Sequence, residues 1–343
     1  MKQVLTVGVA AWLAVVAVAA AETHWEIQAV DANGLGTHPK VGADPDDPAN
    51  RVVVEGIALN APSELSNLSM WWQLYVQGEG DDHAGTAAWS GIFFQWDLYP
   101  EPFLLTNIAP GDRVRLTGFI ENHLGKINIT ERHSDEPAYN FLVEILEPGV
   151  GMPEPETPSS LAACLGFDVT RLTGGEWYQS RWVRLRGVRA DSGTWAGGQH
   201  VWVTDDDGVT MFPLYLTSTA NWNTTPQPLG PFDAIGVFDQ EAGLGTPMNP
   251  PYTSGYRLWV TNTNGIVPWP CTGDADEDGD VDLTDFGTFS SCFNGPNRAP
   301  AADDCDGMDF DMDDDVDLTD FGMFSSCFNG PNRPAPAACY TAP

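Results

Sequence analysis

The chain contains few basic residues. It has 15 Lys and Arg against 48 Asp and Glu in 343 residues, which gives a formal charge of −33 at pH 7. Nucleic-acid backbones are bound largely by Lys and Arg that neutralise phosphates, so this charge argues against general nucleic-acid binding. An acidic excess instead favours the solubility of an exported protein.

The sequence also lacks the short motifs of common catalytic sites. There is no nucleophile elbow, Walker loop, H-E-x-x-H or G-x-G-x-x-G before a helix. The six His are scattered and no C-x-x-C occurs, which disfavours a zinc site. A glycosidase carboxylate pair cannot be singled out among 48 acidic residues. We therefore expect no catalytic residues; if the protein is an enzyme, it would be associated with glycoside hydrolysis.

A long apolar run occurs only at the N-terminus. Met1-Lys2-Gln3 precedes a largely apolar stretch at residues 4–18, which ends in Ala19-Ala20-Ala21. A basic start, an apolar centre and a small-residue end are typical of a secretory signal peptide. The alternative is a membrane anchor, but the run is short for the ~20 residues of a span. We expect residues 1–21 to be removed and the protein to be secreted, either extracellular or at the cell surface, with no membrane span.

Cysteines are few, and five of the six lie after residue 270: the full set is Cys164, Cys271, Cys292, Cys305, Cys327 and Cys339. Disulfides formed by such a set fit an oxidising compartment. Sequence alone leaves many pairings open. Among them we favour Cys271–Cys292 and Cys305–Cys327, which leaves Cys164 and Cys339 unpaired.

Residues 22–268 show little helical periodicity. Short runs that alternate apolar and polar residues, rich in Val, Trp, Tyr and Phe, are separated by Gly, Asn, Asp and Pro. This pattern predicts β-strands in small barrels or sandwiches. The runs lie at residues 51–59, 71–76, 112–120, 126–131, 181–189, 200–204, 232–238 and 256–260.

Two boundaries divide the chain. Residues 147–160 read E-P-G-V-G-M-P-E-P-E-T-P-S-S, a composition that predicts a semi-rigid linker. A turn-rich piece, I-V-P-W-P, precedes the acidic C-terminal part. The predicted parts are a signal peptide (1–21), a first β module (22–148), a linker (149–160), a second β module (161–268) and a calcium-binding module (271–343).

Each β module contains a strand that alternates basic and apolar residues and has a Gly in its middle. The first reads D-R-V-R-L-T-G-F and the second R-W-V-R-L-R-G-V. In these strands the chain resembles OB-fold modules, in which such a strand bends at its Gly to help close a five-stranded barrel. The second module also resembles OB-like domains of secreted bacterial proteins, through T-W-A-G-G-Q-H-V-W-V-T-D-D-D-G and Y-T-S-G-Y-R-L-W-V. The expected fold class is mainly β, with two OB-like barrels and a small α module.

Two copies of one acidic loop occur near the C-terminus. They read D-A-D-E-D-G-D-V-D-L-T-D (274–285) and D-F-D-M-D-D-D-V-D-L-T-D (309–320). Each is followed by a nearly identical stretch of sequence. Carboxylates at loop positions 1, 3, 5, 9 and 12 suit a twelve-residue loop that wraps a hard cation in oxygen ligands. Without a cation, like charges a few Å apart repel strongly. The sequence therefore predicts two bound Ca²⁺ ions.

This part of the chain resembles a type I dockerin, a duplicated F-hand in which each calcium loop is followed by one helix. The resemblance implies side-chain ligands at positions 1, 3 and 5, a backbone carbonyl at 7, a direct or water-mediated ligand at 9 and both carboxylate oxygens at 12. The implied ligands are Asp274, Asp276, Asp278, Asp280, Asp282 and Asp285 in the first loop, and Asp309, Asp311, Asp313, Asp315, Asp317 and Asp320 in the second.

The resemblance carries further expectations. Position 6, where a sharp turn is needed, holds Gly279 in the first loop but Asp314 in the second, so we expect a weaker or neighbour-dependent second site. Val281 and Val316, at position 8, should pair across the two units in a short β-bridge. Phe recurs at helical spacing after each loop, at 286, 289, 293 and at 321, 324, 328, and we expect most of these rings to form the core.

Dockerins bind cohesin domains, usually through loop positions 10 and 11 and the following helix. These positions are Leu283-Thr284 and Leu318-Thr319, identical in both units, which allows a two-fold symmetric binding mode. The repeat is longer than the usual spacing and lacks the basic pair of the family. A cohesin-like or surface protein is therefore the expected partner, rather than a standard cohesin.

The sequence favours a non-catalytic secreted protein that uses this tail for attachment or complex assembly and its OB-like modules for binding. One alternative is a component of extracellular polysaccharide degradation, a hydrolase or a carbohydrate-binding subunit, with Trp71, Trp72, Trp96 and Trp222 as a candidate stacking platform. Another is single-stranded nucleic-acid binding by an Arg face made of Arg181, Arg184, Arg186 and Arg189.

Overall fold

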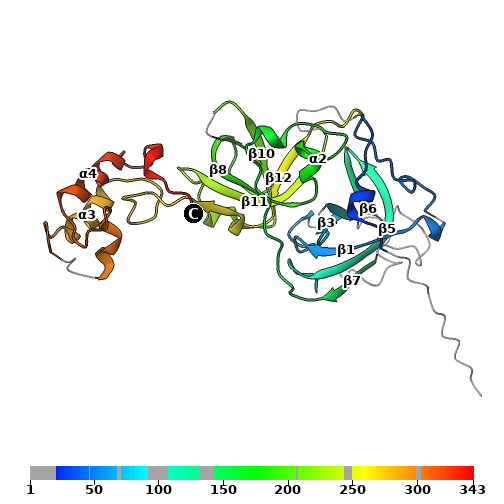
Figure 1. Cartoon of the computed structure of the whole chain (residues 1–343), viewed down its shortest axis with the longest axis horizontal. Helices are drawn as coiled ribbons and strands as arrows, with labels where there is room; N and C mark the ends of the chain where they lie inside the picture. The colour runs from blue at the N-terminus through cyan, green and yellow to red at the C-terminus, as the bar shows by residue number, and fades with distance from the viewer. Residues whose placement is uncertain are drawn as a thin grey trace, which may run out of the picture.

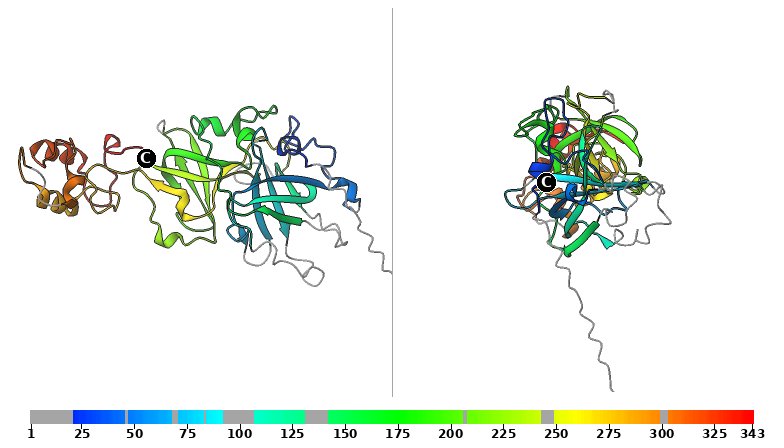
Figure 2. Two further views of the ribbon diagram at one scale, coloured as in Figure 1. Left: turned by 60° about the horizontal axis from the view of Figure 1, so that its bottom comes forward. Right: turned by 90° about the vertical axis from the view of Figure 1, so that its right-hand side faces the viewer.

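The computed structural model of the chain describes residues 21–45, 47–67, 71–82, 84–91, 107–130, 142–205, 208–242, 249–298 and 303–343. Nearly all of the expected signal peptide, residues 1–20, lies outside these ranges. Three lobes lie in a row along the long axis, two made of strands and a smaller helical one at the C-terminal end (Figure 1). The two further views in Figure 2 show the same row from another side and nearly end-on.

The first β lobe is a closed five-stranded barrel. Its strands are β1 (Val52–Ala58), β3 (Trp71–Gln77), β4 (Gly85–Gly91), β5 (Arg113–His123) and β6 (Lys126–Thr130). They follow the order β1-β3-β4-β6-β5, and β5 pairs back to β1. All pairs are antiparallel except β4–β6. Two strands attach outside this ring: β2 (Ser66–Asn67) at β3 and β7 (Leu142–Glu147) at β5.

The second β lobe repeats this topology. Its strands are β8 (Trp182–Gly193), β9 (Gln199–Thr204), β10 (Met211–Leu216), β11 (Phe232–Gln240) and β12 (Tyr256–Val260). The order is β8-β9-β10-β12-β11, β11 closes on β8, and only β10–β12 is parallel. Barrels with this five-strand order are OB-folds. The expected fold class, two OB barrels with a small helical part, is confirmed.

Helices in the β lobes are short. They are α1 (His24–Ile27) and α2 (Gly174–Tyr178), with single 3₁₀ turns η1 (Pro48–Asn50), η4 (Ala162–Cys164), η5 (Trp222–Thr224) and η6 (Thr263–Gly265). A last strand, β13 (Ile266–Pro268), pairs with β11 at the exit toward the helical lobe. No helix among the described residues has the length and apolar character needed to cross a bilayer.

The glycine bend expected in the basic–apolar strands is present in β8. Gly187 has a φ of +63°, a left-handed conformation open to glycine, and the pairing of β8 with β11 shifts register beside it. In β5, Gly118 is the last residue paired with β1 before the strand continues along β6. The two similar-looking strands are not equivalent, because β8 is the first strand of its barrel and β5 the fourth.

The barrels share an interface that contains an apolar cluster and a buried group of charged side chains. Leu59, Leu65, Tyr75 and Ala87 of the first barrel pack in one cluster with Val237 and Trp259 of the second. Across the interface, Asp239 Oδ1 accepts hydrogen bonds from Tyr75 Oη at 2.7 Å and from Lys126 Nζ at 3.0 Å, and its Oδ2 accepts one from Arg257 Nε of its own barrel at 2.9 Å. Burial opposes ionisation of Asp239, but Lys126 and Arg257 lower its pKa overall. The two barrels are thus fixed to each other.

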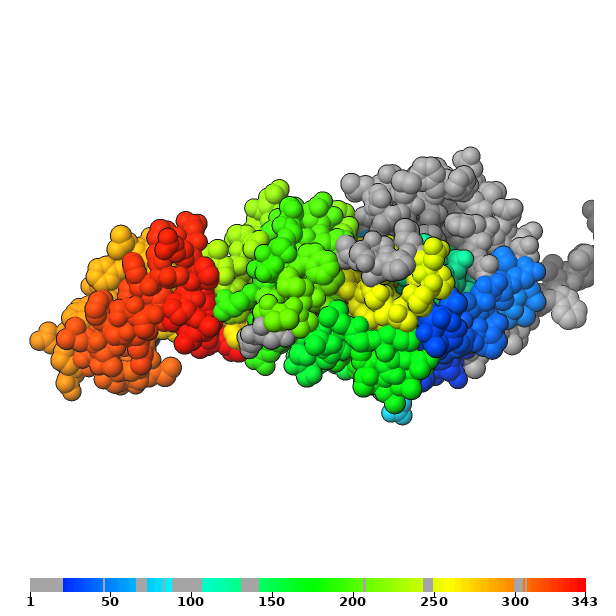
Figure 3. Space-filling model, turned by 90° about the horizontal axis from the view of Figure 1, so that it is seen from above, coloured from blue at the N-terminus to red at the C-terminus, as the bar shows by residue number. Residues whose placement is uncertain are grey.

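The helical lobe contains two ten-residue helices, α3 (Leu283–Cys292) and α4 (Leu318–Cys327), with 3₁₀ segments η7 (Asp303–Met308) and η8 (Ala337–Cys339). In space-filling view it forms a separate lobe beside the second barrel (Figure 3). Only Phe289 and Phe324 of the six repeated rings are fully buried; Phe286, Phe293, Phe321 and Phe328 are each about 40% exposed. The expectation that most of these rings are core was wrong, because disulfide cysteines, Val281, Val316 and Tyr340 fill much of that space.

Candidate metal centre

Each acidic loop leads directly into one helix and is closed by its last carboxylate. Asp285, 1% exposed, accepts hydrogen bonds from Ala275 N at 2.7 Å near the loop start and from Asp282 N at 2.7 Å near its end. Asp282 in turn caps α3 by accepting from Thr284 N. The position-12 carboxylate therefore joins both ends of the loop and orders the first turn of the helix.

The second loop reproduces this geometry almost bond for bond. Asp320, fully buried, accepts from Phe310 N at 2.7 Å and from Asp317 N at 2.8 Å, and Asp317 caps α4. The first carboxylate of each loop also has the same role: Asp274 accepts from the amides at positions 5 and 6, and Asp309 does so in the second loop. The two loops, whose sequences differ only at positions 2, 4 and 6, thus share these hydrogen bonds.

Position 6 has a left-handed backbone in both loops. Gly279 has a φ of +97° and Asp314 a φ of +70°. A residue with a Cβ adopts this conformation at some cost in free energy, and Asp tolerates it better than most. The expected turn at position 6 is present in both loops, and only the second has a non-glycine residue there.

The two units are linked through positions 7 and 8. The Val281 carbonyl accepts hydrogen bonds from Asn329 N and Gly330 N after α4, and the Val316 carbonyl accepts them from Asn294 N and Gly295 N after α3, all at 3.0–3.1 Å. The expected β-bridge between the two valines is therefore wrong: within the described lobe, the N-G turn that ends each helix pairs with the opposite loop instead.

The position-7 side chains add to this link. Asp280 accepts a hydrogen bond from Asn332 N, and Asp315 accepts one from Asn297 N, each from the turn after the other unit's helix. Sequence reasoning assigned these residues only a backbone carbonyl ligand. Their carboxylates hold the two units together, a role that the sequence could have signalled only through the paired N-G-P-N turns.

Carboxylate oxygens converge in both loops. In the first, oxygens of Asp274, Asp276 and Asp278 lie within 4.8 Å of one another, as do those of Asp280, Asp282 and Asp285; in the second, the groups are Asp309, Asp311, Asp320 and Asp315, Asp317, Asp320. Asp313 is the one expected ligand outside these groups. Each of these residues stands at its expected loop position, and the clusters could hold a metal ion.

The electrostatics of the loops also favour a cation. Burial, reinforced by neighbouring carboxylates, raises the pKa of Asp274 to about 6, and the same causes raise the pKa values of Asp276 and Asp311. Asp311 Oδ1 is buried and has no hydrogen-bond partner in the described part of the chain. A cation would supply both the missing partner and the missing positive charge, and oxygen-only donors suit a hard ion such as Ca²⁺. The residues present therefore fit a bound calcium ion.

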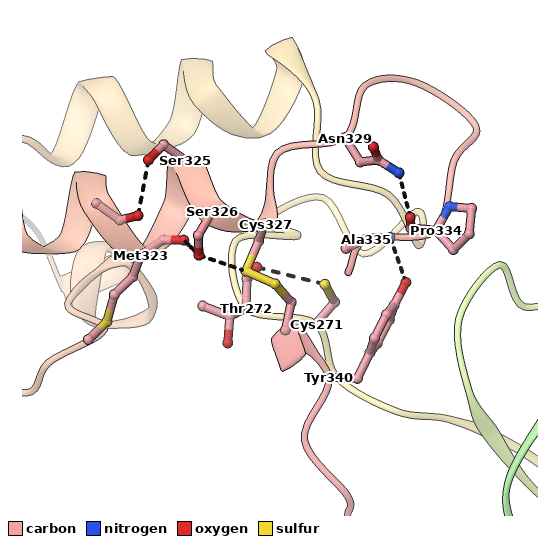
Figure 4. The surroundings of a disulfide bond; sticks show 12 residues. Cys271, Thr272, Met323, Ser325, Ser326, Cys327, Asn329, Pro334, Ala335 and Tyr340 are labelled. Atoms are coloured by element: carbon pink, nitrogen blue, oxygen red, sulfur yellow. Dashed lines mark hydrogen bonds between the residues drawn. A yellow bond between two sulfur atoms is a disulfide. The ribbon is translucent and has the colours of Figure 1, made fainter. Parts of the chain in front are cut away.

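The disulfides differ from the pairing favoured above. Cys292 is bonded to Cys305 and Cys327 to Cys339, so each bond ties the end of a helix to the segment that follows it. The favoured Cys271–Cys292 and Cys305–Cys327 pairs were wrong, because each chain segment continues past its helix and returns to that helix end. Cys164 and Cys271 are free. Cys271 lies beside the Cys327–Cys339 bond (Figure 4), where burial raises the pKa of its thiol to about 12.

The helical lobe contacts the second barrel through its last residues. Tyr340 lies so close to Gly230 that a Cβ there would be 2.2 Å from the Tyr340 ring, and Arg189 lies over the same ring at 5.3 Å. Arg186 donates to the Pro343 carbonyl.

Arg181 is buried and its guanidinium donates to Glu156 at 2.9 Å. The four arginines of the expected basic face therefore do not gather on one exposed surface.

The expected aromatic platform has only one member whose side chain is described. Trp222 is 4% exposed and packs edge-on against Trp195 in the core of the second barrel. Trp96 lies outside the described residues, and nothing is stated of the side chains of Trp71 and Trp72. Trp222 is therefore a core residue.

Comparisons with known proteins do not assign the chain to a family. No family model matches the chain. No curated protein matches it. Two solved structures show weak likeness: the p204 HINb domain, 10% identical with a TM-score of 0.26 over 60% of this chain and 90% of that one, and the tetrameric p202 HIN2, 12% identical with a TM-score of 0.26 over 61% and 85%. Values this low carry no argument about function.

Proposed function

We propose that the protein is exported and that its C-terminal lobe binds two Ca²⁺ ions and attaches the paired OB barrels to a partner protein, in the manner of a dockerin. The main support is the near identity of the two acidic loops, in which each carboxylate stands at the position that an oxygen-ligand loop requires. The ligands would be the twelve aspartates named above. Two disulfides in the same lobe support an oxidising compartment.

A symmetric exposed surface supports attachment. Leu283 and Leu318, at position 10 of each loop, are 74% and 73% exposed, and Phe286 and Phe321, one turn further along each helix, lie 6.3 Å apart between ring centroids. Exposed apolar side chains that cluster on one face often mark a protein-binding site. The partner surface would be apolar and would accept the lobe in either of two orientations.

Calcium titration of the full-length protein tests the first half of this proposal. Isothermal calorimetry after chelator treatment should show two ions per chain. Asp285→Asn and Asp320→Asn should each remove one of them, whereas Asp191→Asn, an exposed acid on β8, should remove none. Absence of calcium uptake by the native protein would contradict the proposal.

Affinity capture from the native extracellular and envelope fraction tests the second half. The full-length protein should retain a specific protein in calcium and release it in EDTA. Leu283→Asp with Leu318→Asp should abolish capture, whereas either change alone should weaken it only partly, because one orientation remains. Leu172→Asp, at a leucine 64% exposed before α2, is the matched control.

A further inference from the structure

A half-open cavity of about 490 Å³ lies where the inter-barrel linker, β8 and the exit toward the helical lobe meet. Its floor is apolar, formed by Leu161, Leu185 and Val188, each buried. Its walls carry Trp269, Asp205 and Arg186. The volume falls within the roughly 300–1,000 Å³ of small-molecule sites, which also combine an apolar lining with a few polar groups.

Trp269 is held in a fixed orientation. Its Nε1 donates to Asp233 Oδ1 at 2.7 Å, and its main-chain N donates to the Pro231 carbonyl at 3.0 Å. The same Asp233 oxygen accepts from Gly187 N at 2.9 Å. A Cβ at Gly187 would lie 2.7 Å from the indole ring, so this glycine lets the ring pack directly on the strand. A preorganised aromatic ring at a cavity wall binds at a low cost in conformational entropy.

Asp205 is the acidic residue of the cavity lining. Its Oδ2 accepts from Leu161 N at 3.0 Å, which fixes the carboxylate at the end of β9. Its Oδ1 is buried and has no hydrogen-bond partner among the described residues. Leaving a buried acceptor unpaired is costly, so a donor supplied by a ligand would be favourable.

The charges of the lining select the type of ligand. Arg186 is exposed at the rim, while Asp205 provides a negative charge inside. An anionic ligand would be repelled by Asp205 and by the protein's charge of −33, and a cationic ligand would be repelled by Arg186. A neutral ligand with many hydroxyls would meet neither repulsion. Its hydroxyls could donate to Asp205 and accept from Arg186, and the C–H face of a sugar ring could lie on the indole.

We propose that this cavity binds one or two rings of a neutral carbohydrate, with Trp269 as the stacking residue and Asp205 as the principal hydroxyl acceptor. This site is separate from the calcium loops and does not rest on the proposed attachment function.

The test is calorimetry and saturation-transfer NMR on the calcium-loaded full-length protein with cellobiose, maltose, xylobiose and di-N-acetylchitobiose. At least one should bind with a millimolar or tighter Kd. Asp205→Asn, which retains an acceptor for Leu161 N, and Trp269→Ala should each weaken binding by about tenfold. Trp202→Ala, a half-buried Trp of β9 outside the cavity lining, should leave the affinity within about twofold.

Two outcomes would overturn the proposal: no binding by any of the four sugars, or equal losses in Trp202→Ala and Trp269→Ala. Because Trp269→Ala could disturb the lobe junction, Asp205→Asn is the decisive variant, provided its thermal midpoint matches the native one. Cellobionate, the anionic counterpart of cellobiose, serves as a further arm. It should bind at least about tenfold more weakly if cellobiose binds, and equal binding would contradict the neutral-ligand argument.

Discussion

At the junction of the barrels, the buried carboxylate of Asp239 is surrounded by Lys126, Arg257 and Tyr75. In the helical lobe, Asp285 and Asp320 are as deeply buried, but backbone amides and other carboxylates surround them. The first region therefore carries its own counter-charges, whereas no described Lys or Arg forms an ion pair with the carboxylates of the second. The barrels should be stable in any buffer of moderate pH, and the lobe should be stable only with a cation.

Calcium removal should separate the two regions most clearly. Each of the two proposed ions would stabilise the lobe by about 4 kcal/mol when free calcium exceeds Kd a thousandfold, and chelation would remove this contribution. We expect α3 and α4 to lose amide protection in EDTA while β1 and β8 keep theirs, measured by hydrogen exchange and mass spectrometry. Equal protection of α3 with and without calcium would contradict the metal assignment.

The barrel junction should respond to a mutation that leaves the lobe unaffected. Asp239→Ala leaves Lys126 buried without its counter-charge, and breaking such a pair costs about 3–5 kcal/mol. Urea unfolding followed by Trp fluorescence should show this loss in calcium and in EDTA alike, because residues 271–343 contain no Trp and most of the rings lie in or beside the barrels. Glu144→Ala, which removes an exposed partner of Arg115, should cost less than about 1 kcal/mol.

Glu176 adds a third way to bury an acid, which is protonation. It accepts a hydrogen bond from Tyr256 Oη at 2.7 Å, and burial raises its pKa to about 7. A folded-state pKa above the ordinary value near 4.5 means that the folded protein binds this proton more tightly. The contribution is therefore fully present below about pH 4.5 and is lost as the pH rises through 7. The thermal midpoint of the barrels should fall between pH 5 and pH 8, and Glu176→Gln should flatten that fall; an unchanged slope would contradict it.

The smallest expected effect lies within the lobe. Asp314→Gly removes the cost of a left-handed Asp, at most about 1 kcal/mol, so calcium affinity of the second loop should rise by about fivefold or less. Gly279→Asp should lower the affinity of the first loop by a similar factor. Calorimetry on both variants would show whether position 6 alone distinguishes the two sites, and no change in either would contradict this account.

Sequence patterns located most of the barrel strands but missed one in each. All eight predicted runs correspond to observed strands. The structure adds β4, which reads G-T-A-A-W-S-G and has no clear apolar alternation, and β10, which contains Pro213. Pro argues against an interior strand, but the parallel pairing of β10 with β12 begins only at Leu214. Rules based on local sequence patterns do not detect such pairing between strands that are distant in sequence.

In the candidate site too, local features could be predicted from the sequence and non-local ones could not. The position of each loop carboxylate follows from local spacing, so the aspartates were assigned in advance. The link from Asp280 to Asn332 depends on how the two units fold against each other, and the Cys327–Cys339 bond depends on how the segment after α4 returns to its helix; spacing specifies neither. The Trp269 cavity likewise forms from four separate segments of the chain.

The attachment of the helical lobe has a mechanical consequence. Residues 266–268 of β13 pair antiparallel with residues 232–234 of β11, immediately before the chain leaves for the lobe. If the lobe is anchored as proposed, a pull on the barrels is transmitted through this strand pair. Trp269, whose indole donates to Asp233 of β11, adds a second connection at the same place. The junction between β13 and β11 would therefore carry the tension on a tethered protein.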